Sequence, residues 1–369
     1  MRAPDAFLPT PTPASWALTD DQRSLCAASQ RFAREQLEPL LAQPPTVSAW
    51  QDIVKLAAAL DLGAMILPEH QGGMAIDRHD LALVMDALAA GPVERAAELT
   101  LSVPALMTLR AHHALGALSA RPVQQYFDAT TSIDLTIPAS DAAMVWRLRP
   151  AADATGLTML IDTSQRLILA RRAYPPQSSQ PARVATPGGL VLEKLDINEA
   201  LVRPPLRVIE QRDSGCIAPA QTWLTEAALY LSALLTGAMK HSVTFAFAYA
   251  GARQAFRKPL AAHQLVATRL SEMLVAAHGS HLFLRSVSAS SASASTSLIR
   301  QLIRHVAAES IDVDRELVQL CGGHGYVEGL PPAARFQSCH WFACLLMQID
   351  ATLDRFAKLQ PEPHPGTSP

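Results

Sequence analysis

The chain has 369 residues, of which 49% are hydrophobic and 17% are charged, and its formal net charge is -2. This length exceeds what one small core needs and predicts two or three packed units. The near-neutral charge, without a basic stripe or a block of like charges, argues against nucleic acid as the main partner.

The cysteines and the apolar segments indicate the compartment. Five cysteines occur at loose spacing without a CxxC pair, as is typical of free thiols in a reducing compartment. Residues 1–13 lack the apolar segment of a signal peptide. The longest apolar stretch, residues 227–239, contains Tyr230, Ser232 and Thr236 and falls short of the roughly 18 apolar residues of a membrane span. We therefore expect a soluble, cytoplasmic protein with no membrane span.

Residues 1–128 are predicted to form a helical domain. Thr19 and Gln22 have the spacing of a capping box, in which each side chain bonds to the backbone N–H of the other residue. Two further helices are expected, one from about residue 50 that ends at Gly63 and one from Asp77 that ends near Gly91. More helix is expected as far as about residue 126.

Residues 129–212 change in character and predict a small β domain. Ile133, Leu135 and Ile137 alternate with polar residues, as in a half-buried strand. Proline and glycine separate further short apolar runs, as between strands. These runs cover residues 157–161, 167–170 and 190–195.

Residues 213–360 predict a bundle of four long helices. The first, residues 222–252, is apolar nearly all round and should be central and buried. A Ser/Ala tract at 288–296 is expected to be a loop between the second and third helices. The fourth helix is expected over residues 336–359, followed by a disordered tail at 361–369. The predicted fold class is therefore mainly α with a small middle β domain.

Two motifs in the predicted bundle carry a resemblance to a known family. Residues 249–264 read YAGARQAFRKPLAAHQ, which resembles the acyl-CoA dehydrogenase pattern YA..R..FGKP followed by a His-Gln pair. Residues 319–326 read QLCGGHGY and resemble the family's Q..GGxGY, with one long helix between the two motifs. A weaker match is the segment 67–73, LPEHQGG, which is similar to the family's PExxGG turn.

The resemblance implies an acyl-CoA dehydrogenase-like fold, FAD as cofactor, and a flavin ring that lies mainly on a neighbouring subunit. The residue types suit that cofactor, because an arginine pairs with pyrophosphate through two parallel hydrogen bonds and glycine lets the backbone approach a ligand closely. An acyl-CoA substrate, an oligomer and an electron-transfer flavoprotein as acceptor are implied likewise. The residues expected to contact FAD are Arg253, Phe256, His263, Gln264, Gln319, Gly322 and Gly323.

Each of these residues also has an ordinary structural explanation. Taken alone, Arg253 would be an exposed helix charge, Phe256 a core residue, and the glycine pair a helix end. Only their spaced combination favours a cofactor site. A metal site is not expected, because the adjacent Cys339 and His340 would point to different sides of a helix.

The family's reaction needs a carboxylate to remove the α-proton of the thioester. In most members this is a glutamate in a YEGT-like motif, and the corresponding position here, counted without gaps, is Leu346. Asp350 lies one helical turn further, about 5 Å away and too far to act. A minority of the family places the glutamate early in the first bundle helix, at the position of Ala227. Glu226, its neighbour, is the candidate base, although a rotation of about 100° separates the two positions.

The middle domain departs from the family as well. The TEPxxGSD-like stretch is shortened to LTIPASD at 135–141, and RDA is replaced by QSC at 337–339. The chain thus keeps the part that holds a neighbour's FAD and loses the part that cradles its own flavin. This resembles the base-lacking subunit of heteromeric members, such as those of bacterial steroid side-chain degradation. Two alternatives stay open: a self-sufficient dehydrogenase with Glu226 as base, and a non-catalytic relic scaffold.

Overall fold

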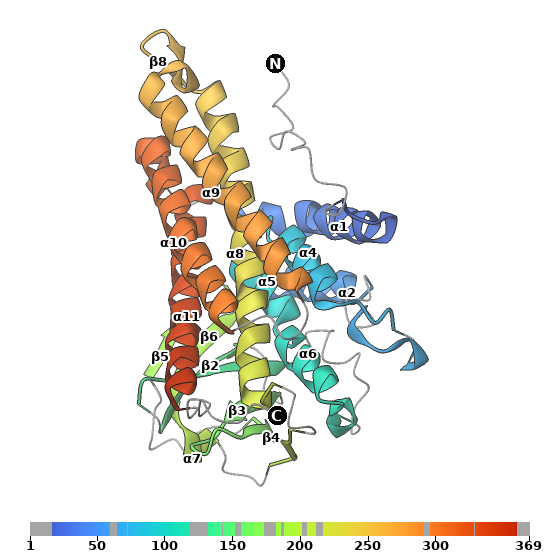
Figure 1. Ribbon diagram of the computed structural model, residues 1–369. Coiled ribbons are helices and arrows are strands. Elements are labelled where there is room, and N and C mark those ends of the chain that lie inside the picture. Colours follow the sequence, from blue (N-terminus) through green and yellow to red (C-terminus); the bar gives the residue numbers. More distant parts are fainter. Residues whose placement is uncertain are drawn as a thin grey trace, which may run out of the picture.

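The computed structural model describes residues 17–59, 65–71, 73–118, 132–141, 143–151, 156–172, 182–185, 188–200, 205–211, 217–290, 296–327 and 329–359. Short helices form one side of the molecule, a bundle of long helices forms the other, and a sheet lies below both (Figure 1). The prediction of a mainly α fold with a small middle β domain is therefore confirmed. The predicted boundaries at 128 and 212 and the predicted tail at 361–369 lie outside the described residues.

The N-terminal helices begin where the sequence provides caps. The amide of Gln22 donates to Thr19 Oγ1 at 3.1 Å and the amide of Thr19 donates to Gln22 Oε1 at 3.0 Å, so the predicted capping box is present. Asp77 caps the α4 helix by accepting from the amide of Asp80 at 2.8 Å. The helix expected after Gly91 is present as two helices, at Val93–Thr100 and Val103–Ala111, while the predicted helix ends at Gly63 and near residue 126 fall on undescribed residues. The helices are α1 (Asp20–Phe32), α2 (Val47–Ala59), α4 (Arg78–Leu88), α5 (Val93–Thr100) and α6 (Val103–Ala111), with short helical turns η2 (Ala33–Leu37), η3 (Glu38–Leu41), η4 (Glu69–Gln71) and η5 (Leu115–Leu118).

The middle domain is a seven-stranded sheet in the order β5-β6-β2-β1-β3-β4-β7. Its central strand β1 pairs antiparallel with β2 and parallel with β3. The three predicted apolar runs form β3, β4 and β6, as expected. The strands are β1 (Ile133–Pro138), β2 (Met144–Pro150), β3 (Leu157–Ile161), β4 (Leu167–Arg171), β5 (Ala182–Ala185), β6 (Leu190–Asp196) and β7 (Arg207–Ile209), with the short helix α7 (Ile197–Ala200) after β6.

The expectation that the first strand is half-buried was wrong, because β1 is buried on both faces. Its polar residues Asp134 and Thr136 are both 0% exposed. The apolar/polar alternation is real, but the second face meets protein instead of water. A buried polar group is tolerated only with partners: Thr136 donates to the carbonyl of Met159 in β3, and Asp134 accepts from Arg172, which directly follows β4.

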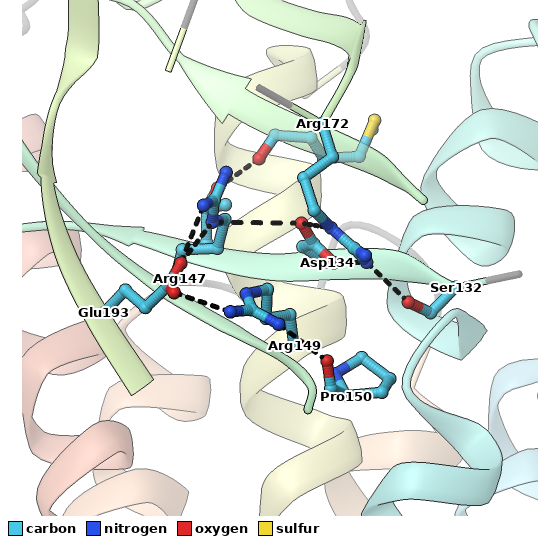
Figure 2. A network of polar contacts seen from close by, with 9 residues as sticks. Ser132, Asp134, Arg147, Arg149, Pro150, Arg172 and Glu193 are labelled. Atoms are coloured by element: carbon cyan, nitrogen blue, oxygen red, sulfur yellow. Dashed lines mark hydrogen bonds and ion pairs between the residues drawn. The ribbon is translucent and has the colours of Figure 1, made fainter. Parts of the chain in front are cut away.

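A buried ionic network satisfies this second face (Figure 2). Arg147 and Arg149 each donate to a different oxygen of Glu193, with the shortest contact 2.7 Å in both cases. Arg172 donates to Asp134 at 2.8 Å. Burial alone would raise the pKa of Glu193, but the hydrogen bonds from Arg149 and Arg147 outweigh it and lower the pKa to about 2. The carboxylate of Glu193 is therefore ionised in the folded protein.

The C-terminal domain is the expected bundle of four long helices. The first of them, α8, is buried along most of its length, as its uniform apolarity predicted. The fourth begins at Pro331, five residues before the expected start at Phe336, since proline fits the first turn of a helix. The second continues to Ala289, so the start of the predicted Ser/Ala loop is helical instead, while residues 291–295 are not described. The helices are α8 (Pro219–Ala252), α9 (Gln264–Ala289), α10 (Thr296–Cys321) and α11 (Pro331–Leu359), with β8 (Gln254–Ala255), β9 (Lys258–Pro259), η7 (Leu260–Ala262) and η8 (Gly322–Tyr326) at their connections.

The bundle is fixed to the N-terminal helices by close backbone contact. A Cβ on Gly237 would lie 2.1 Å from the carbonyl oxygen of Asp86, so α8 can approach α4 this closely only with glycine. Nearby, the buried guanidinium of Arg335 donates to the carbonyls of Ala90 at 2.6 Å and Ala238 at 3.2 Å, joining α11 to both elements. None of the described helices is long and apolar enough to cross a membrane.

We predict that Gly237→Ala destabilises the protein by about 1–3 kcal/mol, because the added methyl group forces α8 away from α4. Gly251→Ala, at the end of the same helix, is the matched control. No heavy atom lies within 4 Å of its Cβ position, so the substitution should stabilise the helix by roughly 0.5–1 kcal/mol. Urea unfolding of both variants measures the difference, and equal effects would contradict the close approach.

We also predict that Glu193 makes the fold acid-sensitive. Because its folded-state pKa of about 2 lies below the ordinary 4.5, its stabilising contribution is complete above pH 4.5 and is lost as the pH falls towards 2. Between pH 6 and pH 3 the wild-type chain should lose on the order of 2 kcal/mol more unfolding free energy than Glu193→Gln, which cannot titrate. Urea unfolding at the two pH values tests this, and equal losses would contradict it.

Candidate functional site

The residues predicted to contact a cofactor gather at one end of the bundle. The β8–β9 hairpin joins α8 to α9 at the upper end of Figure 1, and η8 follows α10. Tyr249, on the last turns of α8, connects the two segments: its hydroxyl donates to the carbonyl of Cys321 at 3.2 Å and lies 3.0 Å from Nδ1 of His324. The fold thus brings together the two motifs, which are more than fifty residues apart in the sequence.

The hairpin presents its functional groups outward. Arg253 directly follows α8, is exposed, and forms no ion pair with any residue that the structure describes. Phe256 is 91% exposed, although it is a large apolar side chain. His263 contacts the hairpin through two groups. Its Nε2 lies 3.1 Å from the carbonyl oxygen of Ala255, and its ring centroid lies 6.0 Å from that of Phe256. Gln264, also exposed, begins α9.

The hairpin turn is strained. Phe256 and Arg257 are its two central residues, and their φ angles are +50° and +67°. A two-residue hairpin with positive φ at both positions normally uses Asn-Gly. For other residues the left-handed conformation costs roughly 1–2 kcal/mol each. This chain therefore accepts a local cost to keep an aromatic ring and a guanidinium at an exposed tip.

In the second segment, η8, no side chain covers the backbone at Gly322 and Gly323. No heavy atom lies within 4 Å of a Cβ built on Gly322 or Gly323, whereas one on Gly325 would lie 2.3 Å from the carbonyl oxygen of Val318. Packing within this chain therefore requires glycine at 325 but not at 323. Gln319 is exposed beside them and donates to the hydroxyl of Tyr326 at 3.2 Å. Free backbone, a side-chain amide and an unpaired guanidinium are the groups that bind a pyrophosphate.

A groove between the sheet and α11 is the second part of the candidate site. It has a volume of about 560 Å³, within the usual range of small-molecule sites. Sequence reasoning missed it, because its walls come from two domains; the aromatic residues early in α11 were the only signal. Its lining consists of Trp146, Leu192, Phe336, Gln337, His340, Trp341, Cys344, Leu345 and Gln348.

The groove lies along the first half of α11, whereas the hairpin follows the end of α8. The indole of Trp223, near the start of α8, donates to the carbonyl of Thr136 in the sheet at 3.0 Å. Arg253 lies 30 residues further along the same helix, and at 1.5 Å per residue this is about 45 Å. The groove lies closer to the hairpin than that, because Phe336 lines it and the preceding residue, Arg335, contacts Ala238, 15 residues or about 22 Å before Arg253 along α8.

The stretch predicted to be a remnant of the flavin-binding loop is covered by α11. The carbonyl of Pro138 accepts from the Gln348 side chain at 3.0 Å and from the Thr352 hydroxyl at 3.2 Å. The guanidinium of Arg355 donates to Ala139 at 2.6 Å and to Ser140. The backbone carbonyls at the end of β1 are therefore bound within the chain.

The usual position of the catalytic base holds no carboxylate. Leu346 lies inside the uninterrupted α11 and is 0% exposed. Asp350, one turn on, accepts from Arg300 at 2.7 Å and from Arg304 at 2.8 Å. Both residues therefore have structural roles: one fills the core and the other joins α10 to α11.

The alternative base, Glu226, is buried in an ion pair. It is 5% exposed, and Arg78 donates to its Oε1 through both Nε, at 3.0 Å, and Nη2. The cavity beside it measures about 10 Å³, which holds roughly one water molecule and no thioester. The cavity is lined by apolar residues of α4, α6 and α8, among them Leu81, Ala82, Met85, Val103, Met107 and Leu229.

Cys339 and His340 point to different sides of α11, as expected. Cys339 is buried, and burial together with the nearby charge of Asp314 raises the pKa of its thiol, while His340 is exposed. In the part of the chain that the structure describes, no group of three His, Cys, Asp or Glu residues is arranged to hold a metal ion.

Comparisons with known proteins address the fold and the family. Residues 19–116 match the model for the acyl-CoA dehydrogenase N-terminal domain, and residues 214–343 match that for the acyl-CoA dehydrogenase C-terminal domain. No curated protein sequence matches the chain.

Solved structures share the fold over nearly the whole chain. Butyryl-CoA dehydrogenase from Megasphaera elsdenii superposes with a TM-score of 0.70 at 16% identity, covering 94% of this chain and 100% of its own. A glutaryl-CoA dehydrogenase from Mycobacterium smegmatis in complex with FADH2 gives 0.69 at 15% identity, with 94% and 96% covered. A chain from work on the electron transferring flavoprotein of Acidaminococcus fermentans gives 0.73 at 14%, with 94% and 100% covered.

We predict that the ion pair of Glu226 stabilises the fold. Arg78→Ala would leave a buried carboxylate without its partner and should lower the unfolding free energy by about 3–5 kcal/mol. The double variant Arg78→Ala/Glu226→Leu removes both charges and should recover much of this loss. Lys55→Ala, which breaks an exposed ion pair with Asp52, is the control and should cost under about 1 kcal/mol. A double variant no more stable than Arg78→Ala would contradict the interpretation.

Proposed function

The chain belongs to the acyl-CoA dehydrogenase family, and on that premise we propose that it is a subunit of an FAD-dependent acyl-CoA dehydrogenase that completes the FAD site of a partner subunit. The observation that carries the proposal is the open end of the bundle: Arg253 is exposed without an ion pair among the described residues, Phe256 is 91% exposed, and no heavy atom lies within 4 Å of a Cβ built on Gly323. Groups of this kind serve a second subunit, so the protein acts as an oligomer.

Each residue would have a defined task in the assembled site. Arg253 would neutralise the pyrophosphate through its two parallel N–H groups, and the amide of Gln319 would add a hydrogen bond. Phe256 would cover an apolar ring face and exclude water, while Gly322 and Gly323 admit the cofactor to the backbone. His263 holds the hairpin, and Gln264 offers a further amide. FAD, when bound, supplies the hydride acceptor of the reaction.

The groove is the place on this subunit that suits a planar ring, since Trp146, Phe336 and Trp341 line it. The chain offers no free carboxylate beside it at Leu346 or Asp350. We therefore assign the base that removes the α-proton of the acyl-CoA thioester to the partner subunit. An electron-transfer flavoprotein would reoxidise the flavin, and the substrate would belong to lipid or steroid catabolism in the cytoplasm.

Two other functions make different predictions. A self-sufficient dehydrogenase would use Glu226 as its base, and it is disfavoured by the bond from Arg78 and the small cavity beside it. If the chain alone oxidises an acyl-CoA and Glu226→Gln abolishes that activity, this alternative is correct. A relic scaffold would bind no flavin in any assembly.

We predict that the purified chain alone carries little FAD, and that co-expression with a base-containing dehydrogenase subunit gives a yellow complex with near-stoichiometric flavin. In that complex Arg253→Ala should lower FAD affinity by at least tenfold, because a charge-assisted hydrogen bond contributes about 1.5–3 kcal/mol. Arg315→Ala, which removes an exposed arginine from α10, is the control and should leave the affinity unchanged.

The visible absorbance of the complex and fluorescence titration with FAD measure both quantities. If the purified chain alone carries a full complement of flavin, then a homo-oligomer of this chain, and not a partner subunit, binds the flavin ring. A colourless complex with every co-expressed partner would support the scaffold function and overturn the proposal.

A further inference from the structure

A second group of buried charged residues lies where the N-terminal helices meet the bundle. Glu94 on α5, Asp314 on α10 and Arg335 on α11 are each at most 5% exposed. The guanidinium of Arg335 is held in place by its bonds to the carbonyls of Ala90 and Ala238. Glu94, Asp314 and Arg335 form the junction cluster, which thus draws on both helical domains.

The junction cluster contains two carboxyl groups and one cation. Arg335 interacts electrostatically with both Asp314 and Glu94. The next cation along α5, Arg95, is already engaged, because it donates to Glu98 at 2.7 Å. Two buried anions beside one guanidinium would leave a negative charge unbalanced in a region of low dielectric constant. One of the two carboxyl groups therefore keeps its proton.

The other titratable groups that face the junction cluster add no compensating charge. Burial and the charge of Arg335 lower the pKa of His241, on α8, to about 3, so this ring is neutral near pH 7. Burial and the charge of Asp314 raise the pKa of the Cys339 thiol, which is therefore protonated. Glu38, on η3, is exposed, so water screens its charge.

Glu94 lacks the donors that keep the other buried glutamate ionised. Two arginines bond to Glu193, whereas Oε2 of Glu94 has no hydrogen-bond partner among the described residues. Asp314 accepts from the hydroxyl of Ser242 at 2.5 Å, but its Oδ2 has no such partner either. Burial raises the pKa of Glu94 to about 7 and raises the pKa of Asp314 as well. Because Arg335 couples the two carboxyl groups, the retained proton belongs to the pair.

Glu94 also lies against the middle domain. A Cβ built on Gly188, just before β6, would lie 2.3 Å from Cγ of Glu94, so the backbone passes directly over this side chain. A charge that appears on Glu94 therefore acts on the contacts of α5 with the sheet as well as with α11.

We propose that the junction cluster is a pH-sensitive contact between the N-terminal helices and the bundle: it holds one proton between Glu94 and Asp314, and loss of that proton on alkalinisation loosens α5 from α11. A carboxyl group whose pKa is higher in the folded state binds more protons there than in the unfolded chain. Its stabilising contribution is complete below pH 4.5 and is lost as the pH rises through 7, the opposite direction to Glu193. The inference is independent of the proposed function, because it involves neither a cofactor nor a partner subunit.

Urea unfolding of the full-length chain at pH 5 and pH 8 tests the inference. Between these pH values the folding equilibrium constant of the wild-type chain should fall about 50-fold more than that of Glu94→Gln, which cannot titrate. Asp314→Asn leaves one carboxyl group for one guanidinium and should remove most of the same difference. Glu272→Gln, which replaces an exposed glutamate on α9, is the matched control and should behave as the wild type does.

Amide hydrogen exchange at pH 6 and pH 8 locates the effect. After correction for the intrinsic pH dependence of exchange, residues 93–100 and 331–345 should exchange faster at pH 8 in the wild-type chain but not in Glu94→Gln. If the wild-type pH dependence of unfolding persists in either Glu94→Gln or Asp314→Asn, the cluster holds no shared proton and the inference is wrong. Faster exchange confined to other elements also overturns it. Should one variant fail to fold, the other variant and the wild-type exchange pattern decide the outcome.

Discussion

The burial of α8 at the centre of the molecule is the constraint on which the other elements depend. A helix that is apolar nearly all round must be covered along most of its length, so every domain supplies a surface to it. Its length of 34 residues makes it a common axis for the sheet, the N-terminal helices and the other bundle helices. Its contacts follow in order from one end to the other: Trp223 with β1, Tyr230 with α5, Gly237 with α4, Ser242 with α10 and Tyr249 with η8.

The same axis separates the two parts of the candidate site. The hairpin follows the end of α8, whereas the groove lies between the sheet and the first half of α11. In the function that we propose, a cofactor held by the hairpin lies between subunits. The exposure of Phe256 supports this, because a large aromatic side chain that is 91% exposed in one chain gains most of its burial energy from a partner.

The central region of the chain is filled by its own side chains where chemistry would need space. Leu346 occupies the core of an unbroken α11, Arg78 binds the carboxylate of Glu226, and Arg355 covers the end of β1. Each of these contacts stabilises the fold and at the same time removes a group or a space that a self-sufficient dehydrogenase would use. These contacts are the physical basis of the supporting role that we propose for this chain.

The sequence by itself determined the elements whose signals are local. The capping box at Thr19 predicted the start of the first helix, and the uniform apolarity of residues 222–252 predicted the central helix of the bundle. The sequence could not show whether the polar face of β1 is buried. An alternating pattern is the same whether that face meets water or the guanidinium of Arg147. Nor could the sequence place the groove or the Arg78–Glu226 pair, whose members are far apart in the chain. Only the tertiary structure decided these, since burial and ion pairing depend on which surfaces meet and not on the residues that precede and follow.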